Sequence, residues 1–245
     1  SHSVVLTEDG LLFKRRAQEI VALSEKTKRD FIRGNRELSG EIGIGCGEFR
    51  SIQIIAQIMK EFKKEHPFVT FQIYSGNSSN IKERIESGIL DIGVILDYVD
   101  IRKYEYVRIP LSEEWGVLVR EDSPLAAMEY VTPEDIRELP LIISERSMRD
   151  NELADWIGKK YEDLNIVSTY NLMYNAAIMV ANGMGVAGCI KLDCRYEGTR
   201  FVPARPSVKN NSVFAWKKAL SQSQAVSSFI EFSRIYIKRI SSNTT

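Results

Sequence analysis

The start of the chain constrains the fold most, because it joins a long charged helix to the first strand of an α/β pattern. Residues 7–33 are expected to form one helix, which Thr7 can cap before two acidic residues in its positive first turn. The Gly34-Asn35 pair is expected to end it, since both residues tolerate the left-handed conformation. Glycine then alternates with isoleucine over residues 40–45, which predicts a short buried strand.

Small and apolar side chains recur along this helix at alternating steps of four and three. That spacing is the a/d pattern of a coiled-coil seam, so the helix is expected to dimerise. Two hydroxyl residues weaken the seam, and the alternative is a helix that packs on its own domain. The predicted dimerisation residues are Phe13, Ala17, Ile20, Leu23, Ser24, Thr27 and Phe31.

Composition narrows the functional class. The 33 basic and 33 acidic side chains cancel, whereas a fragment that binds DNA by itself usually carries a basic excess. No apolar run approaches the roughly 18 residues of a membrane span, and no signal-peptide pattern is present. Three cysteines make no disulfide framework, which favours a reducing, cytoplasmic compartment.

Strands and helices alternate from residue 40 onward, which predicts a parallel sheet with helices on both faces. Ligands of such sheets bind at the carboxyl ends of the strands, near helix N-termini. The first unit is expected to contain a strand at 41–45, a helix at 51–65, a strand at 69–74, a helix at 80–87 and a strand at 91–96.

A second unit is expected to follow the strand at 115–119. Its predicted elements are a helix that starts at Thr132-Pro133, a strand at 139–143, a helix at 151–161, a strand at 166–170 and a helix at 175–182. The strand at 213–216 and the helix at 224–239 have no partner there and are expected to return to the first unit. The chain would then form lobe I from residues 40–120 and 212–240, and lobe II from residues 121–211.

The order of several motifs resembles the LysR-type transcriptional regulators. Each motif alone is weak, but their order and spacing together are specific and cover essentially the whole chain. They are Leu6-Thr7-Glu8-Asp9-Gly10, Gly40-Glu41-Ile42-Gly43-Ile44-Gly45, Gly88-Ile89-Leu90-Asp91-Ile92-Gly93, Ser123-Pro124-Leu125-Ala126 and the run from Met179 to Ala187. The resemblance implies an α/β, two-lobed type-2 periplasmic-binding-protein-like fold, with a small effector held between the lobes.

The resemblance also implies a regulator. In that family the first motif closes a winged helix-turn-helix, so residues 1–36 would be the end of the wing and the dimerising linker helix. A DNA-binding head is then expected ahead of this chain, reoriented in a dimer or tetramer when the effector binds. The alternative is a solute-binding protein of a transport system with the same two-lobed fold.

Polar side chains that follow the predicted strands suggest the effector site. The first N–H groups of the helix at 51–65, with Ser51 and Arg50, would make an anion site, so a small carboxylate or amino acid is expected. Serines here are about equally well explained as helix caps, and arginines as ion-pair residues. The predicted effector-binding residues are Cys46, Glu48, Arg50, Ser51, Ser75, Asn77, Asp97, Ser144, Arg146 and Tyr174.

Catalysis and cofactors are not expected. The chain has two histidines, so the usual general base is scarce, and no cysteine or histidine pair has metal-ligand spacing. The glycine-rich run at 183–188 follows a helix, whereas a dinucleotide-binding loop follows a strand. Redox sensing remains a lesser alternative, since it needs an exposed cysteine of low pKa with a partner within reach.

Overall fold

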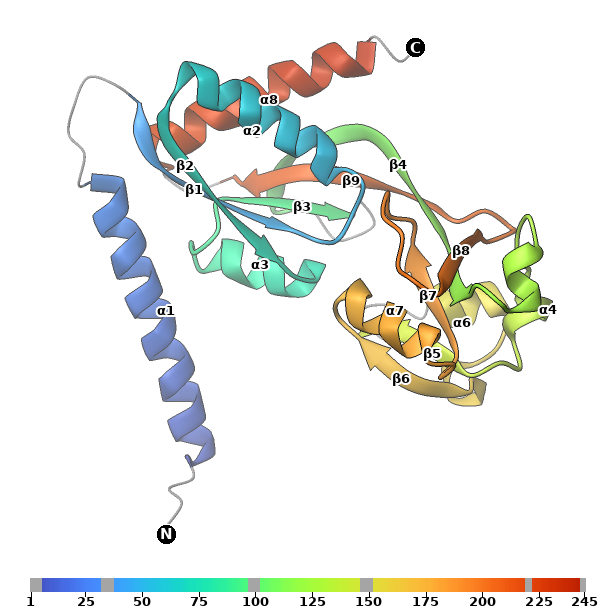
Figure 1. Cartoon of the computed structure of the whole chain (residues 1–245). Coiled ribbons are helices and arrows are strands. Elements are labelled where there is room, and N and C mark those ends of the chain that lie inside the picture. Colours follow the sequence, from blue (N-terminus) through green and yellow to red (C-terminus); the bar gives the residue numbers. More distant parts are fainter. Residues whose placement is uncertain (1–5, 32–37, 97–101, 146–151, 219–221, 243–245) are drawn as a thin grey trace.

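The structure is a computed structural model that describes residues 6–31, 38–96, 102–145, 152–218 and 222–242 (Figure 1). The chain forms a mixed α/β fold preceded by a long helix. In chain order the elements are α1 (Glu8–Phe31), β1 (Ser39–Cys46), α2 (Ile52–Glu65), β2 (Phe68–Ser75), α3 (Ser78–Glu86), β3 (Ile92–Leu96), β4 (Tyr104–Arg120), η1 (Pro124–Ala127), α4 (Pro133–Ile136), β5 (Leu141–Ser144), α6 (Glu152–Ile157), η2 (Tyr161–Asp163), β6 (Ile166–Tyr170), α7 (Met173–Ala181), β7 (Val186–Ile190), β8 (Thr199–Pro203), β9 (Lys209–Lys217) and α8 (Gln224–Ser242).

The strands form one continuous path in the order β2-β1-β3-β9-β4-β7-β5-β6, and β8 pairs with β4. The parallel pairing predicted from the sequence is present between β1 and its neighbours β2 and β3, and between β5 and its neighbours β6 and β7. By contrast, β4 and β9 run antiparallel to their partners. Antiparallel strands result where the chain passes from one lobe to the other and back.

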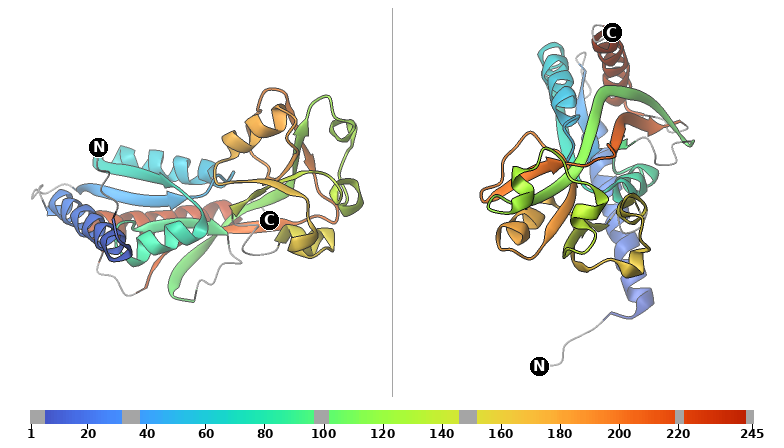
Figure 2. Two further views of the ribbon diagram at one scale, coloured as in Figure 1. Left: turned by 90° about the horizontal axis from the view of Figure 1, so that it is seen from below. Right: turned by 90° about the vertical axis from the view of Figure 1, so that its right-hand side faces the viewer.

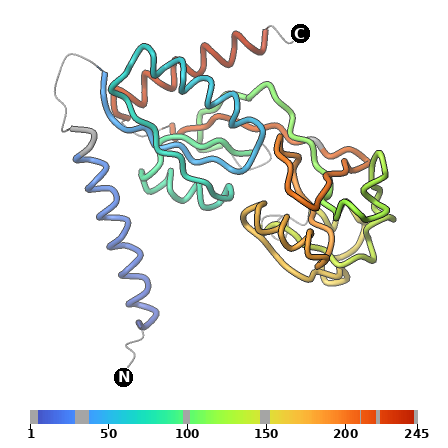
Figure 3. The backbone as a smooth tube through the Cα atoms, viewed as in Figure 1, coloured from blue at the N-terminus to red at the C-terminus, as the bar shows by residue number. Residues whose placement is uncertain are grey.

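Two long strands connect the lobes. Residues 104–114 of β4 pair with β9, with a register shift between Arg108 and Ser112, and residues 115–120 pair with β7 and β8. Figure 3 shows the chain running from one lobe to the other and back. The chain therefore passes between the lobes within β4, ahead of the predicted boundary at residue 120.

Each lobe has apolar clusters on both faces of its part of the sheet. In lobe I, α2 and α8 cover one face and α3 covers the other (Figures 1 and 2). Aromatic rings lie at the centre of the first cluster. The ring centroid of Phe229 lies 4.9 Å from that of Phe71, 5.1 Å from that of Phe62 and 6.1 Å from that of Phe214. In lobe II, α4 and α6 pack on one face, and α7 packs on the other.

Several elements differ from the sequence predictions. Strands β7 and β8 and the first half of β4 were not predicted. The helix predicted at 151–161 ends at Ile157, because Gly158 adopts a left-handed φ of 73°. The long helix, predicted at 7–33, is described from Glu8 to Phe31.

Helix α1 projects from the body and contacts it near β1 (Figure 1). Lys26 anchors this contact: its Nζ lies 2.5 Å from Asp91 Oδ1 and donates to the Gly88 carbonyl at 3.2 Å. The other Asp91 oxygen accepts the Gly43 N–H at 2.8 Å, and burial raises the pKa of Asp91 above its ordinary value. Helix α1 is thus tied to lobe I through a largely buried ion pair.

The predicted seam residues of α1 remain largely exposed. Phe13 is 75% and Ile20 is 69% exposed, Leu23, Ser24 and Thr27 are also exposed, and Ala17 is half-buried. The side chain of Phe31 lies outside the described part of the chain. Dimerisation through this seam stays a prediction.

Replacing Lys26 with methionine should destabilise the protein in a pH-dependent way. The variant leaves the Asp91 carboxylate buried without its cation, at a cost of about 2 kcal/mol, between the values for exposed and fully buried pairs. A raised folded-state pKa means that protonation favours the folded state. The deficit should therefore be largest at neutral pH and shrink as pH falls through the raised pKa of Asp91 toward 3.8.

Urea unfolding of wild type and variant across this pH range measures the effect. Lys28→Met is the matched control, because Lys28 is exposed and pairs with Glu25 of the same helix. A deficit that is independent of pH would contradict the assignment to Asp91.

Candidate functional site

A cavity of about 110 Å³ lies between the two lobes. It is bounded by the carboxyl ends of β1, β2, β5 and β6, where a parallel sheet is expected to place its ligand. The lining residues are Gly47, Glu48, Phe49, Gly76, Asn77, Ser78, Trp115, Ser144, Glu152, Tyr170, Asn171, Met173, Gly188, Cys189, Ile190, Leu192 and Asn210. Side chains from both lobes therefore contribute to one small chamber with both polar and apolar walls.

Glu48 spans this cavity. It follows β1 in lobe I, and its Oε2 accepts the N–H of Met173, the first residue of α7 in lobe II, at 2.7 Å. Leu172, at the N-cap of α7, has no side-chain acceptor, so a residue of the opposite lobe caps this helix.

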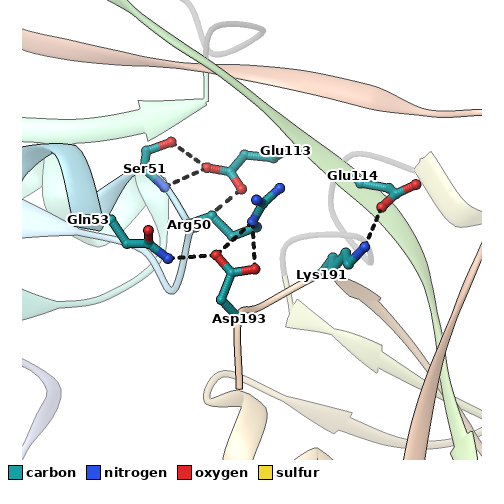
Figure 4. Close-up of polar contacts among 7 residues, drawn as sticks. All are labelled: Arg50, Ser51, Gln53, Glu113, Glu114, Lys191 and Asp193. Atoms are coloured by element: carbon teal, nitrogen blue, oxygen red, sulfur yellow. Dashed lines mark hydrogen bonds and ion pairs between the residues drawn. The ribbon is translucent and has the colours of Figure 1, made fainter. Parts of the chain in front are cut away.

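The start of α2 is held by a buried carboxylate from β4. Glu113 is 1% exposed and accepts the N–H of Ser51 at 2.9 Å and that of Arg50 at 3.2 Å. The Ser51 hydroxyl also donates to Glu113, as Figure 4 shows, and therefore accepts from the hydroxyl of Ser212 at 2.5 Å. Because β4 and β9 supply Glu113 and Ser212, this network ties α2 to both connecting strands.

A second polar contact bridges the lobes beside the cavity. Arg50 Nε donates to both carboxylate oxygens of Asp193 at 3.0 Å, and the Gln53 amide donates to the same carboxylate at 2.6 Å (Figure 4). Asp193 follows β7 in lobe II. The hydrogen bond from Arg50 holds the pKa of Asp193 below its ordinary value, so this carboxylate is charged at neutral pH.

The structure brings three of the predicted effector-binding residues together at the cavity, namely Glu48, Asn77 and Ser144. Asn77 also caps α3, since its side-chain oxygen accepts the N–H of Asn80 at 2.9 Å. Asp97 and Arg146 lie outside the described residues. The remaining predicted residues, which do not line the cavity, are Cys46, Arg50, Ser51, Ser75 and Tyr174.

Their positions explain why they do not line it. Ser51 is fully buried and bonded to Glu113, and Arg50 is paired with Asp193. Cys46 is buried, whereas Ser75 and Tyr174 face solvent. The anion site expected at the start of α2 is thus filled by a carboxylate of the chain itself.

Other lining residues were missed by the sequence analysis. Tyr170 is the last residue of β6 and Asn171 follows it, so the rule that placed Ser144 could have found them. Trp115 and Asn210 lie on the two connecting strands. No local sequence pattern predicts that Trp115 and Asn210 line the cavity, because their position depends on where β4 and β9 pass between the lobes.

The cysteines differ sharply in accessibility: Cys194 is exposed, and Cys46 and Cys189 are buried. Burial raises the pKa of both buried thiols to about 12, and the negative charge of Glu113 adds to the effect at Cys46. Since the thiolate is the reactive form, their reactivity at neutral pH should fall by roughly a thousandfold.

A thiol reagent is therefore expected to label one site rapidly in the native protein. Spectrophotometric titration should show about one fast thiol, and Cys194→Ser should remove that phase. Unfolding in denaturant should release the remaining two. A fast phase that survives in Cys194→Ser would show that a buried thiol is accessible.

Across the described ranges, no group of three or more His, Cys, Asp or Glu side chains is placed to hold a metal ion. Within the same ranges, no helix is both long enough and apolar enough to cross a membrane.

Comparison with known proteins identifies the family. Residues 35–236 match the LysR substrate binding domain. YwqM of Bacillus subtilis, named an uncharacterized HTH-type transcriptional regulator, is 33% identical over 159 residues, which cover 62% of this chain and 54% of YwqM. The chain spans 54–62% of the length of the first curated relatives that it matches.

Solved structures share the fold. The effector binding domain of QuiR in complex with shikimate has a TM-score of 0.71 and 18% identity, and the match covers 82% of this chain and 99% of that one. Full-length CbnR complexed with its target DNA has a TM-score of 0.70 and 17% identity, and the match covers 96% of this chain and 83% of that one.

These matches confirm the family resemblance and the two-lobed α/β fold that were predicted from the sequence. They also favour a transcriptional regulator over a transport solute-binding protein, because the curated relatives are HTH-type transcriptional regulators. The chain therefore belongs to the LysR substrate-binding domain family of LysR-type transcriptional regulators.

Proposed function

We propose that this chain senses a small-molecule effector in the cavity between its lobes and, as part of a longer regulator, transmits the binding event to DNA-binding heads. The observation that supports this most is that both lobes line one cavity at the strand ends. A ligand there contacts both lobes at once, so it can favour one arrangement of the lobes over another.

The organisation proposed for the chain follows the sequence prediction. Residues 1–36 provide the end of the wing and the linker helix, and the two lobes provide the sensor. The exposed apolar residues of α1 support self-association through that helix into a dimer or tetramer. Membership of this family supports the proposal of a cytoplasmic, non-catalytic protein. It also supports the proposal that the full-length regulator contacts DNA through a separate DNA-binding domain.

The effector is proposed to contact Glu48, Asn77 and Ser144, which combine the sequence prediction with the cavity lining. Asn171 is a fourth candidate, because it is exposed and lines the cavity. Ser51 is left out of the proposed contacts, since its hydroxyl is bonded to Glu113.

The melting temperature against a panel of carboxylates, amino acids and amines tests this function. A ligand at 100 times its Kd adds about 2.7 kcal/mol, which is roughly 5–10 °C for a chain of this size. Asn171→Trp should abolish the shift, because the exposed position accepts a large side chain that then fills the cavity. Asn165→Trp, at an exposed position outside the lining, is the control. Shifts that persist in Asn171→Trp would place binding elsewhere and overturn the proposal.

A further inference from the structure

Within the described residues, four positions around the cavity that would attract a small anion are occupied by acceptors of the chain. Glu113 accepts hydrogen bonds from the N–H groups of Arg50 and Ser51 at the start of α2. Glu48 accepts one from the first N–H group of α7. The carboxylate of Asp193 pairs with the guanidinium of Arg50. At the start of α3, the side-chain oxygen of Asn77 accepts a hydrogen bond from the backbone N–H of Asn80. Helix N-termini and arginines are the usual anion sites of proteins. Because acceptors of the chain occupy them here, they are not available to an anionic ligand.

Displacing Glu48 would be unfavourable. This carboxylate caps α7, and the N-cap residue Leu172 cannot replace it. An incoming anion would have to evict Glu48 and then remain beside its negative charge in the same small chamber. Two negative charges that close together repel each other.

The charge of the cavity wall points the same way. Among the described lining residues, none is a lysine or arginine, and Glu48 contributes a carboxylate. The aromatic rings of Phe49, Trp115 and Tyr170 also line the chamber. A cation gains from both features, through charge-assisted hydrogen bonds to carboxylate and through attraction to aromatic faces.

We infer that the cavity takes a small ligand bearing a positively charged amine, with the Glu48 carboxylate as its counter-ion, and that it rejects simple anions. This rests on the proposed function of the cavity as the effector site. The sequence predicted a carboxylate or an amino acid as the effector. A positively charged amine is consistent with an amino acid, which carries an ammonium group, and excludes simple carboxylates.

Matched pairs of probes test the charge of the ligand. Benzylamine is compared with benzoate, and putrescine with succinate, by melting temperature of the full chain at neutral pH. We expect the amines to raise the melting temperature and the carboxylates to leave it unchanged. Glu48→Gln keeps an oxygen that accepts the Met173 N–H but removes the charge. It should weaken amine binding tenfold or more, by roughly the strength of one hydrogen bond to a charged group.

Two controls separate the possible failures. Glu65→Gln, at an exposed position at the end of α2 outside the cavity, should bind amines like wild type. Stabilisation by benzoate or succinate that Asn171→Trp abolishes would overturn the charge assignment and leave the cavity as the effector site. Amine shifts that persist in Asn171→Trp, or no shift with either amine, would overturn the inference itself. The paired comparison uses wild type, so it decides the matter even if Glu48→Gln does not fold.

Discussion

Glu113→Ala should lower the free energy of unfolding by about 3 kcal/mol or more, because it removes three hydrogen bonds to a buried charge. The substitution leaves the N–H groups of Arg50 and Ser51 without an acceptor at the start of α2. It also opens a polar void at the point where both connecting strands pass. Buried donors that lose their partner account for much of the cost.

Urea unfolding, followed by circular dichroism, measures this loss. The matched control is the next residue, Glu114, whose carboxylate is partly exposed and pairs with Lys191 at 3.1 Å. Glu114→Ala should cost less than about 1 kcal/mol, as is usual for surface ion pairs. Equal costs for the two variants would show that Glu113 does not hold α2 as described.

Phe229→Ala should cost about 3–5 kcal/mol, the usual range for a buried phenylalanine. Phe229 is fully buried on α8, and its ring contacts Phe62 and Phe71 from α2 and β2. The cavity left behind would weaken the packing of α8 on the sheet and on α2 of lobe I.

Denaturant unfolding again gives the measurement. Ile235→Ala on the same helix is the control, because Ile235 is 61% exposed and should change stability by less than about 0.5 kcal/mol. A similar loss from both substitutions would mean that the helix, and not the aromatic contact, determines the effect.

Local periodicity was enough to predict much of the fold. The amphipathic spacing of α2 and α8, and the apolar run of β3, follow from which face each element buries, so they can be read from neighbouring residues. Strand β7 was missed because its glycines resemble a helix stop. Gly185 precedes this strand for a packing reason: a Cβ there would lie 2.4 Å from the Pro140 carbonyl oxygen.

The candidate site was less predictable, because its chemistry depends on residues far apart in sequence. Glu113 and Glu114 are adjacent and chemically identical, yet one is buried at the start of α2 and the other pairs near the surface. The start of α2 did look like an anion site from its local residues. Its occupant, however, comes from a position 62 residues away.

The division of β4 between the two lobes has a consequence for how the protein could be cut or recombined. Because β9 and the first half of β4 pair within lobe I, whereas the second half of β4 pairs within lobe II, lobe I is built from two segments of the chain that lobe II separates. A lobe cut out on its own would keep only part of β4 and would expose unpaired strand edges, which invite aggregation. Exchange of sensor modules between relatives should therefore succeed for the two lobes as a pair, and fail for either lobe alone.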